Sequence, residues 1–237
     1  MPDLSTATSR DDRPRLLLLD TCGSEASVAL AVGPNVIEEV TFPGRSASER
    51  LIEVIDRLLR AHAWQLRDLN ALAVTRGPGS FTGVRVGLAA AKALAEASAL
   101  PLVAVSRLAV LAARIFHDGL SVLEAGRGEL FWARVHHGVT SDQGVASRSW
   151  VAQHACDLGL PILCEAGCDE DLAAADVQQV APLTASAGLS LALDRLALHA
   201  FDNPLLLDAL YLHKTEQETL DRQRRHQQGI AAGPDQA

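Results

Sequence analysis

The chain has 237 residues, long enough for two small domains and a substantial buried core. Its hydrophobic content of 48% and charged content of 21% are those of a soluble globular protein, without an apolar run that could span a membrane. The net charge of −8 disfavours a protein that grips nucleic acid by itself, because phosphate contacts need clustered cations. Since the N-terminus also has no apolar signal core, we expect a cytoplasmic protein.

The first unit of structure is predicted to begin after a disordered extension, residues 1–14, which is polar and charged. Residues 15–20 form an apolar run that ends in Asp20, and residues 26–32 are its expected hairpin partner. The side chain of Asp20 either caps the turn between them or meets a metal or phosphate, and we leave both readings open. Residues 46–61 are predicted to form an amphipathic helix, whose apolar face is Leu51, Val54, Ile55, Leu58 and Leu59.

A glycine-rich turn, residues 76–85, joins an apolar strand at 70–75 to a small-residue helix that ends near Ser98. Its sequence is Arg-Gly-Pro-Gly-Ser-Phe-Thr-Gly-Val-Arg. Backbone amides at a helix start attract anions, which suggests a phosphate loop. The turn lacks the lysine of a Walker motif and the third glycine of the dinucleotide pattern, so this signal is weak and a structural turn is the alternative. The residues of such a remnant are Asp20, Thr21, Gly77 and Gly79.

The helix after this turn has glycine or alanine at intervals of three and four residues, namely Gly83, Gly87, Ala90 and Ala91. These positions place a strip of small residues on one face, against which another helix can pack closely. The strip suits either a partner surface or the chain's own core. A Gly87→Leu variant distinguishes the two, because it loses partner binding in the first case and unfolds in the second.

The second half of the chain repeats the order of elements in the first. After a strand at 100–106 and a helix at 107–117, we expect a hairpin at 121–126 and 129–136, a helix at 150–158, a strand at 160–164 and a helix at 186–200. The repeated order of strands and helices suggests an internal duplication in an α/β protein. We therefore expect a first lobe at 15–106, a second lobe at 107–213 and a polar tail at 214–237.

Catalytic residues do not form a recognisable set in the sequence. The eight histidines include no pair at i and i+4, and His136 and His137, adjacent on a predicted strand, should point to opposite faces. The four cysteines show no paired C-x-x-C spacing and are expected to be reduced and mostly buried. We expect no metal, no cofactor and no catalytic residue in this chain.

Residues 17–21, 27–30, 71–74, 76–85 and 101–106 closely resemble the bacterial TsaB (YeaZ) family. Residues 124–133 resemble its second-domain hairpin, and residues 209–212 resemble its C-terminal signature. The long glycine motif is the most specific of these matches, and the resemblance covers roughly residues 15–213. It implies an actin-like ATPase fold of two ribonuclease-H-like lobes without independent catalysis.

The resemblance also implies partners. TsaB pairs with TsaD, its catalytic paralogue, which transfers a threonylcarbamoyl group to the adenosine beside the tRNA anticodon, and the ATPase TsaE joins them. We expect this chain to form a heterodimer with TsaD and to meet tRNA only through the complex, and a homodimer of the isolated chain stays open. In this family the helices before and after the glycine motif build the pairing surface, so the candidate interface residues are Leu51, Ile55, Ser80, Gly83, Gly87, Ala90 and Ala91.

Four positions depart from the family pattern. Ala47 and Glu53 stand in the first helix where the family usually has histidine and proline, and Glu124 and Gly126 replace its aspartate and arginine in the second-domain hairpin. One alternative is an enzyme that binds NADP or ATP at the turn from Gly77 to Gly83, with Arg107 facing a 2′-phosphate. Another is a peptidase, which the absent metal ligands disfavour.

Overall fold

The computed structural model describes residues 13–115, 117–169, 171–172 and 175–212. The predicted tail at 214–237 and nearly all of the predicted extension at 1–14 lie outside these residues. Within the described part of the chain, the helices are too short or too polar to cross a lipid bilayer.

The first lobe is built on a five-stranded sheet with the order β3-β2-β1-β4-β5. In this sheet β1 is antiparallel to β2 and parallel to β4, and β4 is parallel to β5. The strands are β1 (Arg15–Asp20), β2 (Glu25–Val32), β3 (Asn35–Pro43), β4 (Ala71–Thr75) and β5 (Leu102–Val105).

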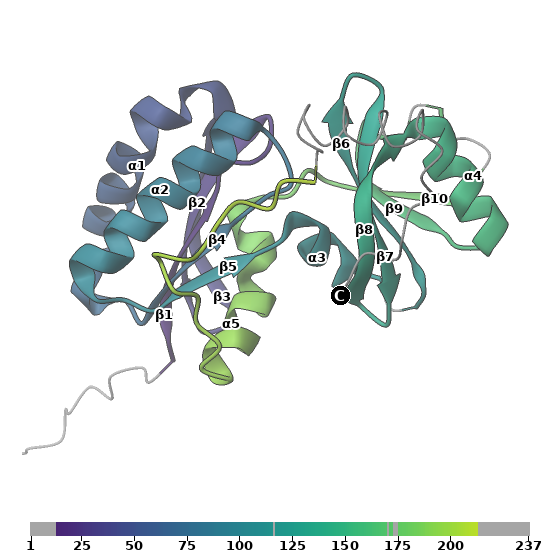
Figure 1. The fold of residues 1–237 in the computed structure, drawn as a ribbon. Coiled ribbons are helices and arrows are strands. Elements are labelled where there is room, and N and C mark those ends of the chain that lie inside the picture. Colours follow the sequence, from purple (N-terminus) through teal and green to yellow (C-terminus); the bar gives the residue numbers. More distant parts are fainter. Residues whose placement is uncertain (1–12, 116, 170, 173–174, 213–237) are drawn as a thin grey trace, which may run out of the picture.

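The second lobe repeats this arrangement. Its sheet has the order β10-β9-β6-β7-β8, in which β6 is antiparallel to β7 and parallel to β9. These strands are β6 (Gly119–Gly126), β7 (Glu129–His136), β8 (Val139–Ser147), β9 (Ile162–Glu165) and β10 (Val177–Val180). The predicted duplication and the two-lobed, actin-like α/β fold are therefore confirmed (Figure 1).

Helices cover both faces of the first sheet. α1 (Ala47–Ala61) and α2 (Phe81–Ser98) lie side by side on one face, over alternate residues of β1 such as Leu17 and Leu19. α5 (Leu189–Ala197) packs on the opposite face, which is formed by residues such as Leu16 and Leu18. Successive side chains of a strand point to opposite faces of the sheet. Because helices cover both faces, every residue of β1 after Arg15 is buried.

α3 (Arg107–Ala112) connects the lobes, and α4 (Arg148–Leu158) covers the outer face of the second sheet. One hydrophobic cluster joins the inner face of the first sheet, α3, α5 and the inner face of the second sheet. Short 3₁₀ helices occur at Gly44–Ser46, Leu66–Asp68 and Ala185–Gly188. The shared cluster packs the two lobes against each other (Figure 1).

The end of the chain returns to the first lobe. The Asp202 carboxylate accepts a hydrogen bond from the backbone of Ala104 at 2.7 Å, and the backbone NH of Leu210 donates to the carbonyl of Arg76 at 2.8 Å. The spatial lobes thus differ from the expected division at 15–106 and 107–213, because α5 and residues 200–212 belong with the first sheet. Two helices are also shorter than expected, since α3 ends at Ala112 and α5 at Ala197.

Candidate functional site

A cavity of about 1010 Å³ lies between the lobes. The first lobe lines it with the β1–β2 turn and the first residues of α1 and α2, including Ser48 and Ser80. The second lobe lines it with the β6–β7 hairpin and the end of β9, including Glu124 and Glu165. Polar groups of both lobes therefore meet in this cavity.

Arg107, one of the residues that line this cavity, forms ion pairs with one carboxylate from each lobe. Its Nε lies 3.3 Å from Asp20 Oδ2 of the first lobe, and its Nη2 donates to Glu165 Oε1 of the second lobe at 2.6 Å. Asp20 is 1% exposed and Arg107 4% exposed. Burial alone would lower the pKa of Arg107, but the charges of Asp20 and Glu165 outweigh it and raise that pKa.

Backbone NH groups hold the two carboxylates, and a backbone hydrogen bond holds the main chain at Arg107. Asp20 Oδ1 accepts from the backbone NH of Cys22 at 2.7 Å, which is the turn cap that the sequence left as one of two readings. Glu165 Oε1 also accepts from the backbone NH of Leu183 at 2.8 Å, and the backbone NH of Arg107 donates to the carbonyl of Gly77 at 2.8 Å. Both carboxylates are thus paired with the same guanidinium, which is the group that the alternative enzyme would need for a 2′-phosphate.

The glycine-rich turn, which carries the predicted phosphate-loop residues Gly77 and Gly79, lies against the β1–β2 turn that follows Asp20 and Thr21. The backbone NH of Ser80 donates to the carbonyl of Cys22 at 2.8 Å. A Cβ on Gly79 would overlap that same carbonyl, and the φ of +158° at Gly79 is unfavourable for side chains. These contacts give the turn a structural role, which was the alternative reading.

The small-residue strip on α2 faces the chain's own β1–β2 turn. A Cβ on Gly83 would overlap the carbonyl oxygen of Thr21, and one on Gly87 would overlap its hydroxyl. The Thr21 hydroxyl donates to the carbonyl of Gly83 at 2.6 Å, and Ala91 is fully buried. The strip therefore lets α2 approach the first sheet of its own lobe.

The other predicted interface residues divide between core and surface. Leu51 and Ile55 are buried on α1, at 2% and 3% exposure. Ser80 is exposed and caps α2, because its hydroxyl accepts from the backbone NH of Gly83 at 3.2 Å, and Ala90 is half-buried. Most of the predicted set is thus inside this chain.

The outer faces of α1 and α2 carry a second group of apolar residues. Ile52 is 57% exposed on α1, Ala89 and Ala93 are exposed on α2, and Val86 and Ala90 are half-buried beside them. We call these five residues the outer apolar face. On α2 this face shares the half-buried Ala90 with the strip of small residues, and the sequence pattern alone did not separate the exposed positions from the buried ones.

The four departures from the family pattern have plain structural places. Ala47 is buried and Glu53 is exposed at the start and middle of α1. Glu124 is paired with Arg148 and accepts from the backbone NH of Gly126 at 2.9 Å, while Gly126 has a φ of +81°, which suits glycine. The hairpin is therefore held at this point by a hydrogen bond of its own and by the first residue of α4.

The reactivity of the cysteines is a first test of the structure. All four are free of disulfides, and Cys156 is exposed while Cys22, Cys164 and Cys168 are buried. Burial, then the neighbouring Asp20 charge, raises the pKa of Cys22 to about 12, and burial, then Cys168, raises that of Cys164 to about 12. A thiol reagent at pH 8 should modify Cys156 quickly and the other three only after unfolding, since the thiolate is the reactive form. Rapid native labelling of Cys22, located by mass spectrometry, would contradict this arrangement.

Comparison with known proteins identifies the family. The chain is 36% identical to the tRNA threonylcarbamoyladenosine biosynthesis protein TsaB of Escherichia coli over 124 residues, 50% of this chain and 54% of that protein. A structure titled YeaZ from Pseudomonas aeruginosa matches with a TM-score of 0.68 and 27% identity, covering 84% of this chain and all of that one. The chain belongs to the TsaB (YeaZ) family. Its matches span about half to two thirds of the TsaB relatives, including 64% of the Bacillus subtilis protein at 34% identity.

A family model and a further relative also match this chain. The family model described as TsaD, tRNA N6-adenosine threonylcarbamoyltransferase, matches residues 41–161, which include α1, the glycine-rich turn and α2. An uncharacterised protein of Mycobacterium tuberculosis is 31% identical over 216 residues, 90% of this chain and 98% of that protein. The residues that the family model matches extend from the end of β3 to just beyond α4 and thus include parts of both lobes.

Two residues of the cavity were missed or misassigned from the sequence. Glu165 was not singled out, although a charged residue at the end of the apolar run Ile-Leu-Cys is an available signal. Arg107 was noticed only as a possible phosphate contact. Glu165 follows one predicted strand, and Arg107 lies where another strand ends and a helix begins. The contact between them therefore depends on how the two lobes pack.

Proposed function

We propose that this protein is a non-catalytic subunit that pairs with TsaD in the formation of threonylcarbamoyladenosine at the adenosine beside the tRNA anticodon. TsaE joins through the complex, and tRNA is met only there, as the net charge of −8 favours. The names of the TsaB relatives and the match to the TsaD family model support this role.

The observation that carries the proposal is the Arg107 bridge. A carboxylate that acts as a general base or binds a metal ion must be free to meet a substrate or that ion. Glu165 accepts a hydrogen bond from the buried guanidinium of Arg107 at 2.6 Å, and Asp20 forms an ion pair with the same group, with 3.3 Å between Asp20 Oδ2 and Arg107 Nε. The bridge therefore favours a structural role for the two acids over a catalytic one.

The outer apolar face is the proposed contact with TsaD. It lies on α1 and α2, the helices that the family resemblance assigns to pairing, and it exposes Ile52 together with small residues that let another helix pack closely. The buried strip supports this face from below, since Gly83 and Gly87 fix α2 against the β1–β2 turn. The proposed interface thus keeps Ala90 from the residues first predicted and otherwise consists of their exposed or half-buried neighbours.

Charged substitutions on this face provide the test. Ile52→Arg and Ala93→Arg place a long cation in a packed contact, and each should weaken binding to TsaD by roughly ten- to a hundredfold, equivalent to about 1 to 3 kcal/mol. The matched control is Leu198→Arg, at a 77% exposed position beyond α5. Binding is measured with purified TsaD by calorimetry, alongside the melting temperature of each variant.

Two results would contradict the proposed contact. Unchanged affinity in both variants would move the interface elsewhere, and equal loss in Leu198→Arg would show a general effect of added charge. Because all three positions are exposed, the melting temperatures should stay close to that of the unaltered chain.

A further inference from the structure

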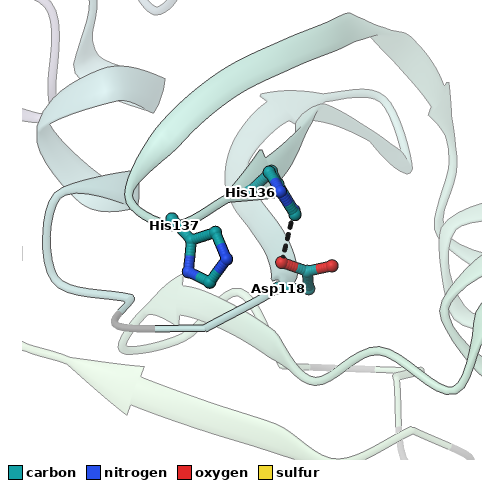
Figure 2. Close-up of side chains that lie close together, drawn as sticks. All are labelled: Asp118, His136 and His137. Carbon is teal, nitrogen blue, oxygen red and sulfur yellow. Dashed lines mark ion pairs between the residues drawn. The ribbon is translucent and has the colours of Figure 1, made fainter.

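Three side chains with metal-binding atoms gather at one end of the second sheet, away from the cavity. Asp118 directly precedes β6, His136 ends β7, and His137 begins the turn to β8. The antiparallel register pairs Gly119 with Val135, which brings Asp118 opposite His136. Figure 2 shows the three side chains together, with His136 paired to Asp118.

The expectation that His136 and His137 point to opposite faces is wrong. It holds for neighbours within a strand, but β7 ends at His136, and His137 has a φ of +48°. Gly138 follows with a φ of +79°, so the two residues form a tight hairpin turn between the paired His136 and Val139. The turn redirects His137, and the centres of the two imidazole rings lie 4.4 Å apart.

The spacing of the ligand atoms suits a single ion. One ligand atom from each of the three residues lies within 4.8 Å of the others, and His136 Nδ1 is 2.6 Å from Asp118 Oδ1. Ligands bound to a tetrahedral zinc ion at about 2.0 to 2.1 Å lie roughly 3.3 Å from one another. The three ligand atoms therefore lie close to the spacing that one bound ion requires.

We propose that Asp118, His136 and His137 bind a divalent transition-metal ion of the zinc class. Two imidazoles and a carboxylate favour zinc, nickel or copper over magnesium or calcium, which prefer oxygen ligands. The side chains of His136 and Asp118 are 66% and 41% exposed, so the remaining coordination position faces solvent. The ion connects the start of β6 to the β7–β8 turn and thereby stabilises the second lobe.

Titration of zinc chloride into the full chain, followed by calorimetry, tests this site. The expected result is one ion bound per chain and a rise in melting temperature with zinc, since a ligand of the folded state stabilises it. His137→Asn should weaken binding at least tenfold while keeping the turn, because asparagine before glycine is favoured there. His136→Ala should have a similar effect on binding.

His199→Asn is the matched control, because His199 is also exposed and has a φ of +54° but lies at the end of α5. It should bind zinc as the unaltered chain does, and magnesium chloride should give no saturable binding. Failure of the unaltered chain to bind zinc would overturn the proposal. So would zinc binding that is unchanged in both His136→Ala and His137→Asn.

Discussion

Replacing Arg107 by methionine should lower the free energy of unfolding by about 3 to 5 kcal/mol, because it leaves the buried Asp20 and the partly buried Glu165 without their shared cation. Asp20 is 1% exposed, so water cannot replace the guanidinium there. The loss should appear in urea unfolding of the full chain as a lower midpoint.

The control for this variant removes the two charges as well. A triple variant, Asp20→Asn, Arg107→Met and Glu165→Gln, keeps the acceptors for the backbone amides of Cys22 and Leu183 but has no buried charge. It should recover part of the stability that Arg107→Met loses. If the single and triple variants are equally destabilised, the charges do not interact as the geometry indicates.

Gly87→Leu should lower the free energy of unfolding by about 3 kcal/mol, because the added side chain overlaps the buried Thr21. For a chain of this length, that corresponds to a fall in melting temperature of roughly 6 to 12 °C. The hydrogen bond from Thr21 to the carbonyl of Gly83 limits how far Thr21 can move away. Thermal unfolding followed by circular dichroism measures the change.

Ala89→Leu is the matched control on the same helix. Ala89 is exposed, two residues from Gly87, so leucine there adds the same side chain without overlap. Its melting temperature should stay close to that of the unaltered chain. A Gly87→Leu protein that melts normally would mean that α2 does not pack on Thr21 as described.

The central elements of the first lobe were predictable because apolar patterns define them. The run of leucines in β1, the stripe of α1 and the small residues of α2 each occur where the sequence placed them. Three strands were missed, namely β3, β8 and β10. They lie at the edges of the sheets, where exposed residues such as Glu38 and Gln178 interrupt the apolar signal.

The site was harder to predict than the fold because it depends on contacts between distant segments. Asp20, Arg107 and Glu165 lie in three elements and two lobes, so no local spacing records their meeting. The strip of small residues was visible, but its spacing is the same whether α2 packs on its own lobe or on a partner. Only the position of Thr21 decides between them.

Reconstitution of tRNA modification tests the central claim most directly. Purified TsaD, TsaE, tRNA and a threonylcarbamoyl donor are combined with or without this chain, and modified adenosine is measured by mass spectrometry. The chain without TsaD should give no product, and addition of the chain to TsaD should raise the yield strongly, but not when it carries Ile52→Arg. Product formed by the chain without TsaD, or a TsaD yield that is independent of the chain, would contradict the account.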